Sequence, residues 1–505
     1  MVCKKPSFVA LFFNKWRKNE MIKLNGLQPV WDKTIIDEER TTADFEIGTP
    51  VKKECVFKAD LPWELGMAHY ANVIEDQGKY KMYYISHMKR DKKKSVITPG
   101  ETLEFLDLYV CYAESEDGIH WEKPALGICE YEGSYENNII LRSMDKPEEG
   151  GFFDNFFAFI DKNPNCPPEK RYKATAYMEH YKLGGYSSPD GIHWNFECIF
   201  DLEGKFDTLN VCWWDEKIGR YVAYVRDFHD IPEDGDLNRG IRDARRTESD
   251  DFIHWTKPEL ITFNETDDYP IYTNNVSRYY RNPDIYIGFP TRYEERLAWN
   301  DSFEELCGKE ARQKQIEICP RYGLTVTDCV FMASRDGVRF DKCDEALFAP
   351  GYEFDANWLY GNCYPAYFMW ETPVGDGENK ELSMLVGQYY RHSNSKYRDI
   401  YERYTLRIDG FACYKAKYKG AKVVTKPFIF DGDEMRLNFA TSAKGSIYIT
   451  LRDEDGNEAK TCELFGDKID RKVRFENTDL RAFAGKAVTL EFEMKDARLY
   501  AFEFI

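Results

Sequence analysis

The sequence predicts an all-β protein made of repeated antiparallel units followed by a separate C-terminal domain. Three observations support this: one short turn sequence recurs, a strand–turn–strand pattern precedes each copy, and both patterns stop near residue 416. The four copies are residues 115–121 (SEDGIHW), 188–194 (SPDGIHW), 249–255 (SDDFIHW) and 334–340 (SRDGVRF). Their first residues are 73, 61 and 85 positions apart, which is too similar for chance and too uneven for a solenoid.

Each copy has the composition of a tight turn followed by an anchor. Asp suits the first turn position, Gly adopts positive φ without strain, and the apolar and aromatic residues that follow can fix the hairpin in a core. Asp251 is followed by Phe252 instead of Gly, so we expect a different turn in that copy. Residues 409–411 (DGF) are a degraded fifth copy.

Upstream of the copies, polar turns lie between aromatic and β-branched flanks, which is typical of hairpins. Such patterns occupy residues 69–84, 156–178, 211–226, 276–293 and 363–390. Five units of this kind in roughly 360 residues predict a five-bladed β-propeller. The alternative, one large irregular β-sandwich, would not repeat a turn sequence four times.

The predicted domains are an N-terminal tail or upstream extension (1–30), the propeller (31–415) and a C-terminal β-sandwich (416–505). Residues 445–451 and 488–494 alternate apolar and polar side chains with period two, as half-buried strands do. The acidic run at 453–457 fits a hairpin turn better than a calcium loop, because EF-hand ligand spacing is absent. One helix is expected, at residues 303–315 within the fourth blade. The first twenty residues imitate a signal peptide but lack a cleavage site.

Composition restricts the partners. The net charge of −19 argues against nucleic acid and against an anionic membrane surface, and no segment reaches the length of a membrane span. Fourteen cysteines occur without a Cys-x-x-Cys pair, which favours a reduced, cytoplasmic protein. The eight histidines lack ligand spacing, so neither a metal nor another cofactor is expected. A homo-oligomer is left open.

A propeller followed by a sandwich, with Ser-x-Asp-Gly-x-x-Trp turns closing the blades, resembles the five-bladed glycoside hydrolases of families 32, 43 and 68 and relatives such as family 130. The resemblance spans residues 54–505 and is nearest to family-32-like hydrolases whose last domain follows an Asp-Gly-Phe segment. The invertase Asn-Asp-Pro-Asn motif is missing from the first blade, as are Arg-Asp-Pro and Glu-Cys motifs later. Sialidases resemble the chain less, because their Asp-box is one residue longer and they use three arginines.

The resemblance implies cleavage of a glycosidic bond by carboxyl groups at the inner strands of the blades. Position by position, these are Glu64 in blade one as base or nucleophile, Asp154 in blade two as an orienting group, and Asp207 in blade three as the acid. Asp207 departs from the glutamate usual at that position. Glu294, Glu295 and Asp355 are reserve carboxylates.

Aromatic and polar side chains near these positions are candidates for sugar binding, with packing between blades as the structural alternative. They are Trp63, Asn155, Arg226, Arg292, Trp358, Tyr360 and Asn362. We expect a glycoside hydrolase acting on a neutral or mildly acidic oligosaccharide. The alternatives are a family-130-type phosphorylase and a non-catalytic carbohydrate-binding propeller. In the phosphorylase, the basic run Arg239, Arg242, Arg245 and Arg246 would hold phosphate.

Overall fold

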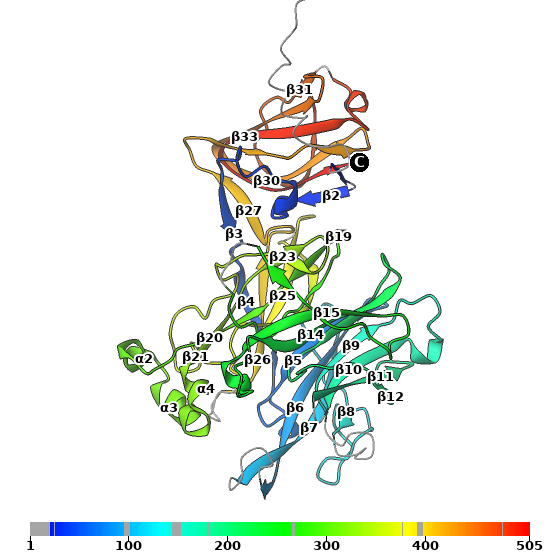
Figure 1. Ribbon diagram of the computed structural model, residues 1–505, viewed down its shortest axis with the longest axis vertical. Helices are drawn as coiled ribbons and strands as arrows, with labels where there is room; N and C mark the ends of the chain where they lie inside the picture. The colour runs from blue at the N-terminus through cyan, green and yellow to red at the C-terminus, as the bar shows by residue number, and fades with distance from the viewer. Residues whose placement is uncertain are drawn as a thin grey trace, which may run out of the picture.

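The chain folds into a propeller and a C-terminal unit that lie end to end along the long axis (Figure 1). The computed structural model describes residues 21–24, 26–94, 102–143, 153–178, 181–264, 268–375, 377–390, 397–476 and 478–505. Within these ranges, no helix has both the length and the apolar character that a membrane crossing requires. The thirteen cysteines in the described ranges are all free.

Each of the first three blades contains four antiparallel strands in sequence order. Blades 2 and 3 are separate sheets, whereas blade 1 shares an eight-stranded sheet with blade 5. Blade 1 contains β5 (His69–Asp76), β6 (Lys79–Lys94), β7 (Thr102–Ser115) and β8 (Ile139–Arg142). Blade 2 contains β9 (Phe153–Ile160), β10 (Tyr172–Met178), β11 (Lys182–Ser188) and β12 (Asn195–Ile199). Blade 3 contains β13 (Val211–Asp215), β14 (Arg220–His229), β15 (Ile241–Ser249) and β16 (Glu259–Leu260).

Blades 4 and 5 each recruit a strand from another part of the chain. Blade 4 contains β18 (Ser277–Tyr279), β19 (Asn282–Gly288), β22 (Met332–Ser334), β23 (Arg339–Lys342) and β17 (Thr262–Phe263). Blade 5 contains β24 (Tyr364–Pro373), β25 (Lys380–Gln388), β26 (Ile400–Leu406) and β4 (Val51–Lys58). Because β4 precedes blade 1 in sequence but pairs with β26, it closes the ring. The predicted five-bladed propeller is confirmed by these pairings.

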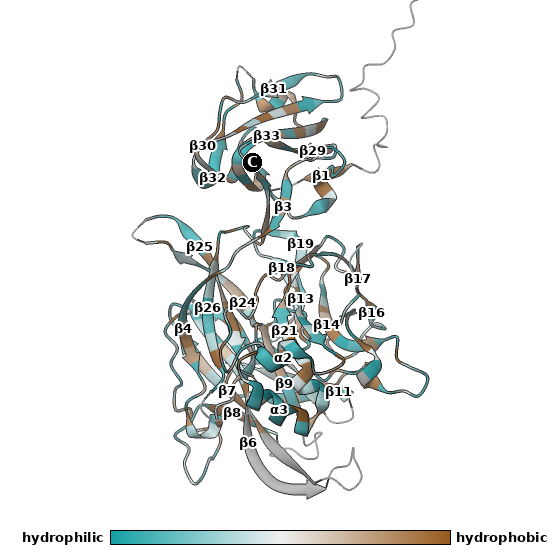
Figure 2. Cartoon of the chain, turned by 90° about the vertical axis from the view of Figure 1, so that its left-hand side faces the viewer, coloured by the Kyte–Doolittle hydropathy of each residue, from teal (hydrophilic) through white to brown (hydrophobic). Residues whose placement is uncertain are grey.

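A helical insertion extends from blade 4, between β20 (Thr291–Glu295) and β21 (Thr325–Cys329). The predicted single helix is instead three: α2 (Asp301–Glu305), α3 (Lys309–Ile318) and α4 (Pro320–Leu324). Asn300 caps α2 by accepting the N–H of Phe303, and Gly308, at φ 74°, separates α2 from α3. Figures 1 and 2 show α2 and α3 together on one flank of the propeller.

All four repeated turns have the same structure. In the first, one oxygen of Asp117 accepts the N–H groups of Ile119 and His120, and the His120 ring lies 2.7 Å from the other oxygen. Asp251 makes the equivalent bonds. The expectation of a different turn at Phe252 is therefore wrong: Phe252 itself adopts φ 70°. Its ring is 3% exposed, and this burial offsets the cost of the left-handed conformation, on the order of 1–3 kcal/mol.

The C-terminal unit is one continuous ten-stranded sheet wrapped around its own core, organised by two long strands. Its C-terminal strands are β27 (Ala412–Ala416), β28 (Ala421–Val424), β29 (Phe428–Phe430), β30 (Met435–Asp453), β31 (Glu458–Lys460), β32 (Asp467–Val473) and β33 (Ala487–Phe504). The long strands β30 and β33 pair with each other along most of their length. The acidic run between β30 and β31 is a hairpin turn, as expected, in which Asp453 accepts the N–H of Asn457.

The N-terminal segment corrects the predicted domain limits. The described part of the predicted tail forms β1 (Ile22–Leu24) and β2 (Gly26–Pro29), which pair with β29 and β33. β3 (Asp44–Ile47), predicted within the propeller, pairs with β27. These blue strands therefore lie among the orange and red strands of the C-terminal unit (Figure 1). Sequence alternation could not reveal this, because such short strands gain their stability from distant partners.

Hydrogen bonds join neighbouring blades all the way around the axis. The Asn72 amide donates to the carbonyl of Ala158 (2.7 Å) and accepts its N–H (3.2 Å), which joins blades 1 and 2. The other contacts are Thr175 Oγ1 to Asn210 O (blades 2 and 3), Thr208 Oγ1 to Tyr272 O (3 and 4), Asn275 Nδ2 to Pro365 O (4 and 5), and a β-bridge between Tyr367 and Asn72 (5 and 1).

We expect Asn72→Leu to lower the free energy of unfolding by about 2–4 kcal/mol, because two buried backbone groups of Ala158 lose their partner. Urea unfolding followed by fluorescence measures this. Asn165→Leu, at an exposed loop position, is the matched control and should change stability by less than about 0.5 kcal/mol. Equal losses in both variants would contradict a structural role for the Asn72 amide.

Candidate active site

The inner strands begin at one end of the propeller axis, and we call the space around these starts the funnel. In four blades the start includes a residue with positive φ: Tyr70 (53°), Asn155 (56°), Asn275 (44°) and Cys363 (62°). The residues before them are all polar: His69, Asp154, Asn274 and Asn362. Register shifts occur beside two of these starts, between His69 and Asn72 and between Thr175 and Tyr177. Such irregularities re-aim side chains.

Two of the three predicted carboxylates influence Tyr177. Tyr177 on β10 pairs with Asp154 at the start of β9. Burial raises the pKa of Tyr177 to about 12, and the negative charges of Asp207 and Asp154 both contribute. Asp154 is half-buried and accepts the N–H of Asn155 at 2.6 Å, whereas Asp207 is exposed. One phenol therefore experiences the charge of carboxylates from blades 2 and 3.

Glu64 lies apart from this pair, in a buried network between blades 5 and 1. Its carboxylate accepts hydrogen bonds from the Leu61 N–H (2.8 Å), the Tyr84 hydroxyl (2.6 Å) and Lys123 Nζ (2.9 Å), and it has no exposed surface. Three donors saturate a carboxylate that water cannot reach. The proposed catalytic position of Glu64 is therefore corrected to a structural one, because the residue belongs to the 3-10 turn before β5 (Pro62–Glu64).

A buried histidine and aspartate stand at the blade 1 start instead. His69 Nδ1 lies 2.9 Å from an oxygen of Asp399, and that oxygen also accepts the N–H of Ala68. Burial raises the pKa of Asp399 to about 8. The His69 ring lies 4.0 Å from the Tyr390 ring, centre to centre. The pair joins blade 1 to the connection between β25 and β26 of blade 5.

Tyrosines form an aromatic wall beside the carboxylates. The Tyr70 hydroxyl donates to that of Tyr272 at 3.1 Å, and Tyr272 contacts the rings of Tyr360 and Tyr364 at 5.6 and 5.7 Å. Thr208, next to Asp207, bonds to the carbonyl of Tyr272, which connects this wall to blade 3. Tyr360, predicted to bind sugar, thus lies in the wall.

Two buried arginines on blade 3 extend the site. Arg226 lies 4.2 Å from the Phe228 ring centre and donates to the carbonyl of Lys205, while Arg242 lies 4.6 Å from the Tyr293 ring centre. They are 5% and 9% exposed. Among the described residues, neither forms an ion pair and neither Nε has a hydrogen-bond partner. Buried cations are ordinarily paired, so an anion is a suitable ligand here.

Several other predicted residues have structural partners elsewhere. Arg292 holds Asp328 through two hydrogen bonds of 2.9 and 2.6 Å. Trp358 donates to the carbonyl of Gly351 and lines a cavity beside the helical insertion. Asn362 bonds to backbone groups of Leu359 and Tyr389. These side chains support loops and are not brought to the carboxylates.

Trp63 is also structural: its Nε1 donates to the side chain of Asn138 at 2.7 Å. Asn155 is buried beside Asp154, and its Oδ1 has no partner among the described residues. The reserves Glu294 and Asp355 are exposed. Burial raises the pKa of Glu295, and the charge of Arg242 opposes that rise.

In the basic run, Arg239 pairs with Asp234 and Asp236, Arg245 with Asp243, and Arg246 with Glu248. Only Arg242 of that run is a buried cation without an ion pair in the described chain. No group of three potential metal ligands occurs within the described ranges.

Sequence reasoning missed Tyr177, His69 and Asp399. Tyr177 and His69 carry a weak signal, since both adjoin a predicted hairpin, but neither residue type marks a site by itself. Asp399 carries no such signal in the sequence, because it is 330 positions from His69 and only closure of the propeller brings the two residues together.

The pH dependence of stability tests the His69–Asp399 pair. With the Asp399 pKa at about 8, the folded protein keeps a proton that an unfolded aspartate releases near pH 4. The folded state therefore binds more protons, and the free energy of unfolding should fall as the pH rises from about 4 to 8, by up to about 1.4 kcal/mol per unit. Asp399→Asn should remove this component in urea unfolding at several pH values. Parallel pH profiles for the two proteins would contradict the raised pKa of Asp399.

No protein-family model and no curated protein sequence matches the chain. Solved structures show a distant likeness. A family 43 arabinoxylan arabinofuranohydrolase from Bacillus subtilis has 10% identity and a TM-score of 0.39, over 90% of this chain and 99% of that one. A family 32 β-fructofuranosidase from Bombyx mori has 9% identity and a TM-score of 0.37, over 94% of this chain and 96% of that one. A family 62 α-L-arabinofuranosidase domain from Coprinopsis cinerea has 7% identity and a TM-score of 0.39, over 71% of this chain and 97% of that one. At these scores the likeness carries no argument, and the propeller assignment rests on the strand pairings.

Proposed function

We propose that the chain is a glycosidase that hydrolyses an O-glycosidic bond in a saccharide. One observation carries the proposal: the charges of Asp154 and Asp207, from different blades, both act on Tyr177, and Asp154 pairs with Tyr177 across β9 and β10. Cleavage of a glycosidic bond needs two carboxyl groups on opposite sides of that bond. An aromatic wall with hydroxyl groups beside them suits a sugar, which has apolar faces and polar edges.

In the proposed reaction, water attacks the anomeric carbon while the bond to the leaving oxygen breaks. Asp154 accepts the proton of the water, because the hydrogen bond from the Asn155 N–H favours its charged form. Asp207 donates a proton to the leaving oxygen. Bound saccharide would displace water from the exposed Asp207.

We expect Asp154→Asn and Asp207→Asn each to lower kcat for glycoside hydrolysis by about 10²–10⁴-fold, since each removes a proton transfer. Saccharide binding, measured by calorimetry, should survive in both. A screen of aryl-glycosides and plant and host oligosaccharides identifies the substrate first.

Asp201→Asn is the matched control, because Asp201 is an exposed carboxylate on the loop that leads to Asp207. Its kcat should stay at the wild-type value. Retained turnover in the Asp154 and Asp207 variants would rule out this carboxylate pair. If the wild-type protein binds saccharides but does not turn them over, the chain is a carbohydrate-binding propeller.

Phosphorolysis is a second candidate, favoured by the buried Arg226 and Arg242 without ion pairs in the described chain. In that reaction phosphate replaces water as the attacking group, and cationic side chains hold it. Asp207 would still protonate the leaving oxygen, so only one carboxyl group would be needed.

Turnover with and without inorganic phosphate separates the two reactions. For phosphorolysis we expect a sugar phosphate product and, in Arg242→Ala, a phosphate KM raised by at least about tenfold, since a hydrogen bond to a charged group contributes about 1.5–3 kcal/mol. Arg239→Ala, which removes an exposed arginine, should leave that KM unchanged. Phosphate-independent release of free sugar would exclude phosphorolysis.

A further inference from the structure

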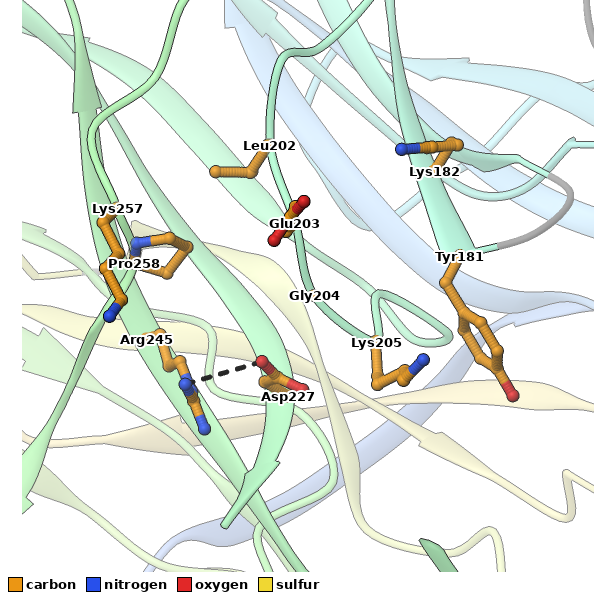
Figure 3. Close-up of a pocket in the computed structure, with 10 residues that line it drawn as sticks. All are labelled: Tyr181, Lys182, Leu202, Glu203, Gly204, Lys205, Asp227, Arg245, Lys257 and Pro258. Carbon is orange, nitrogen blue, oxygen red and sulfur yellow. Dashed lines mark ion pairs between the residues drawn. The ribbon is translucent and has the colours of Figure 1, made fainter. Parts of the chain in front are cut away.

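A cavity of about 540 Å³ lies between blades 2 and 3, on the side of the funnel where Asp207 stands. Figure 3 shows its lining in two groups: Tyr181, Lys182 and Lys205 on one side, and Arg245, Lys257 and Pro258 on the other. The loop 202–205 runs between them, and Asp227 lies near Arg245. The volume is within the range of small-molecule sites, roughly 300–1,000 Å³.

The lining is basic in a protein that is otherwise acidic. Four cationic side chains and two carboxylates line the cavity, whereas the whole chain has a net charge of −19. Arg245 is occupied, because it lies 3.5 Å from Asp227 and 3.1 Å from Asp243. Among the described residues, no ion pair engages Lys182, Lys205 or Lys257. Three ammonium groups are thus available to a ligand.

Residues that line the cavity contact residues of the candidate active site. The ring of Tyr181, in its wall, lies 6.3 Å from that of Tyr177, centre to centre. Lys205 Nζ lies 4.3 Å from the centre of the Tyr181 ring, and the Lys205 carbonyl accepts a hydrogen bond from Arg226. Lys205 precedes Asp207 by two residues. A saccharide at Asp207 and Tyr177 could therefore place its next unit here.

We propose that this cavity binds an acidic unit of the saccharide substrate, a sugar with a carboxylate, sulfate or phosphate group. The inference rests on the proposed glycosidase function and specifies its substrate class. The volume fits a sugar ring with its substituent and is much larger than one small anion needs. Lysines provide mobile point charges, which suit an anionic group at the end of a ring.

A glycan array tests whether acidic saccharides bind, using neutral oligosaccharides and their uronate, sulfated and phosphorylated counterparts. The ionic strength is 0.15 M, at which the electrostatic screening length is about 8 Å. The probe protein is the full chain with Asp207→Asn, which prevents turnover. We expect acidic members to bind best. Adding Lys205→Ala and Lys257→Ala together should weaken their binding about tenfold, at about 0.5–1 kcal/mol per exposed charge pair. Substitution of both lysines by Arg should restore it.

The matched control is Lys419→Ala with Lys444→Ala, which removes two exposed charges from the C-terminal unit and should change nothing. Equal losses in both double variants, binding of neutral members only, or no binding at all would overturn the proposal. Displacement of acidic glycans by an equal concentration of inorganic phosphate would show a small-anion site and also overturn it. Turnover of neutral glycosides alone would refute an acidic substrate but would leave the glycosidase function standing. Binding of acidic saccharides without any turnover would refute the glycosidase function but would leave the acidic binding site standing.

Discussion

The ring of hydrogen bonds between neighbouring blades is the constraint on which the rest of the structure depends. Inner strands of a propeller diverge from the axis, and in the described chain they pair directly only through the bridge between Tyr367 and Asn72, which joins blades 5 and 1. At the other joints, Asn72, Thr175, Thr208 and Asn275 reach across to backbone groups of the next blade. Each buried backbone group left without a partner would cost about 1–3 kcal/mol. The bonds therefore fix the inner strands against one another, and with them the side chains that begin those strands.

The charge of the funnel follows from what this framework places there. The charges of Asp154 and Asp207 already act on one phenol, and burial increases repulsion between like charges. A third ionised carboxylate at the blade 1 start would add to that repulsion. His69 and Asp399 occupy the position as a pair, and the raised pKa of Asp399 means that its carboxyl group keeps a proton at neutral pH. Asp399 thus adds hydrogen bonding to the funnel without adding a negative charge.

The sequence revealed features that are local, and failed where a feature depends on distant contacts. The turns at Asp117 and its three counterparts carry their hydrogen-bonding groups within six residues, so the blades could be counted. Asp154 and Asp207 could be located because each lies at, or a few residues before, the start of an inner strand. Glu64 satisfied the same criterion, but Tyr84 and Lys123 capture its carboxylate from other strands. Phe252 takes the place of the glycine expected in these turns, because burial of its ring offsets the cost of its left-handed backbone conformation.

The acidic surface of the whole chain gives the basic cavity a particular consequence for binding kinetics. At low ionic strength, the net charge of −19 repels an acidic saccharide at long range, while Lys205 and Lys257 attract it at short range. The screening length is about 30 Å at 0.01 M salt and about 10 Å at 0.1 M, so added salt first removes the distant repulsion. Contacts of a few ångströms are screened less. Moderate salt should therefore speed association of an acidic saccharide while its dissociation changes little, which is the opposite of what a basic protein shows toward an anion.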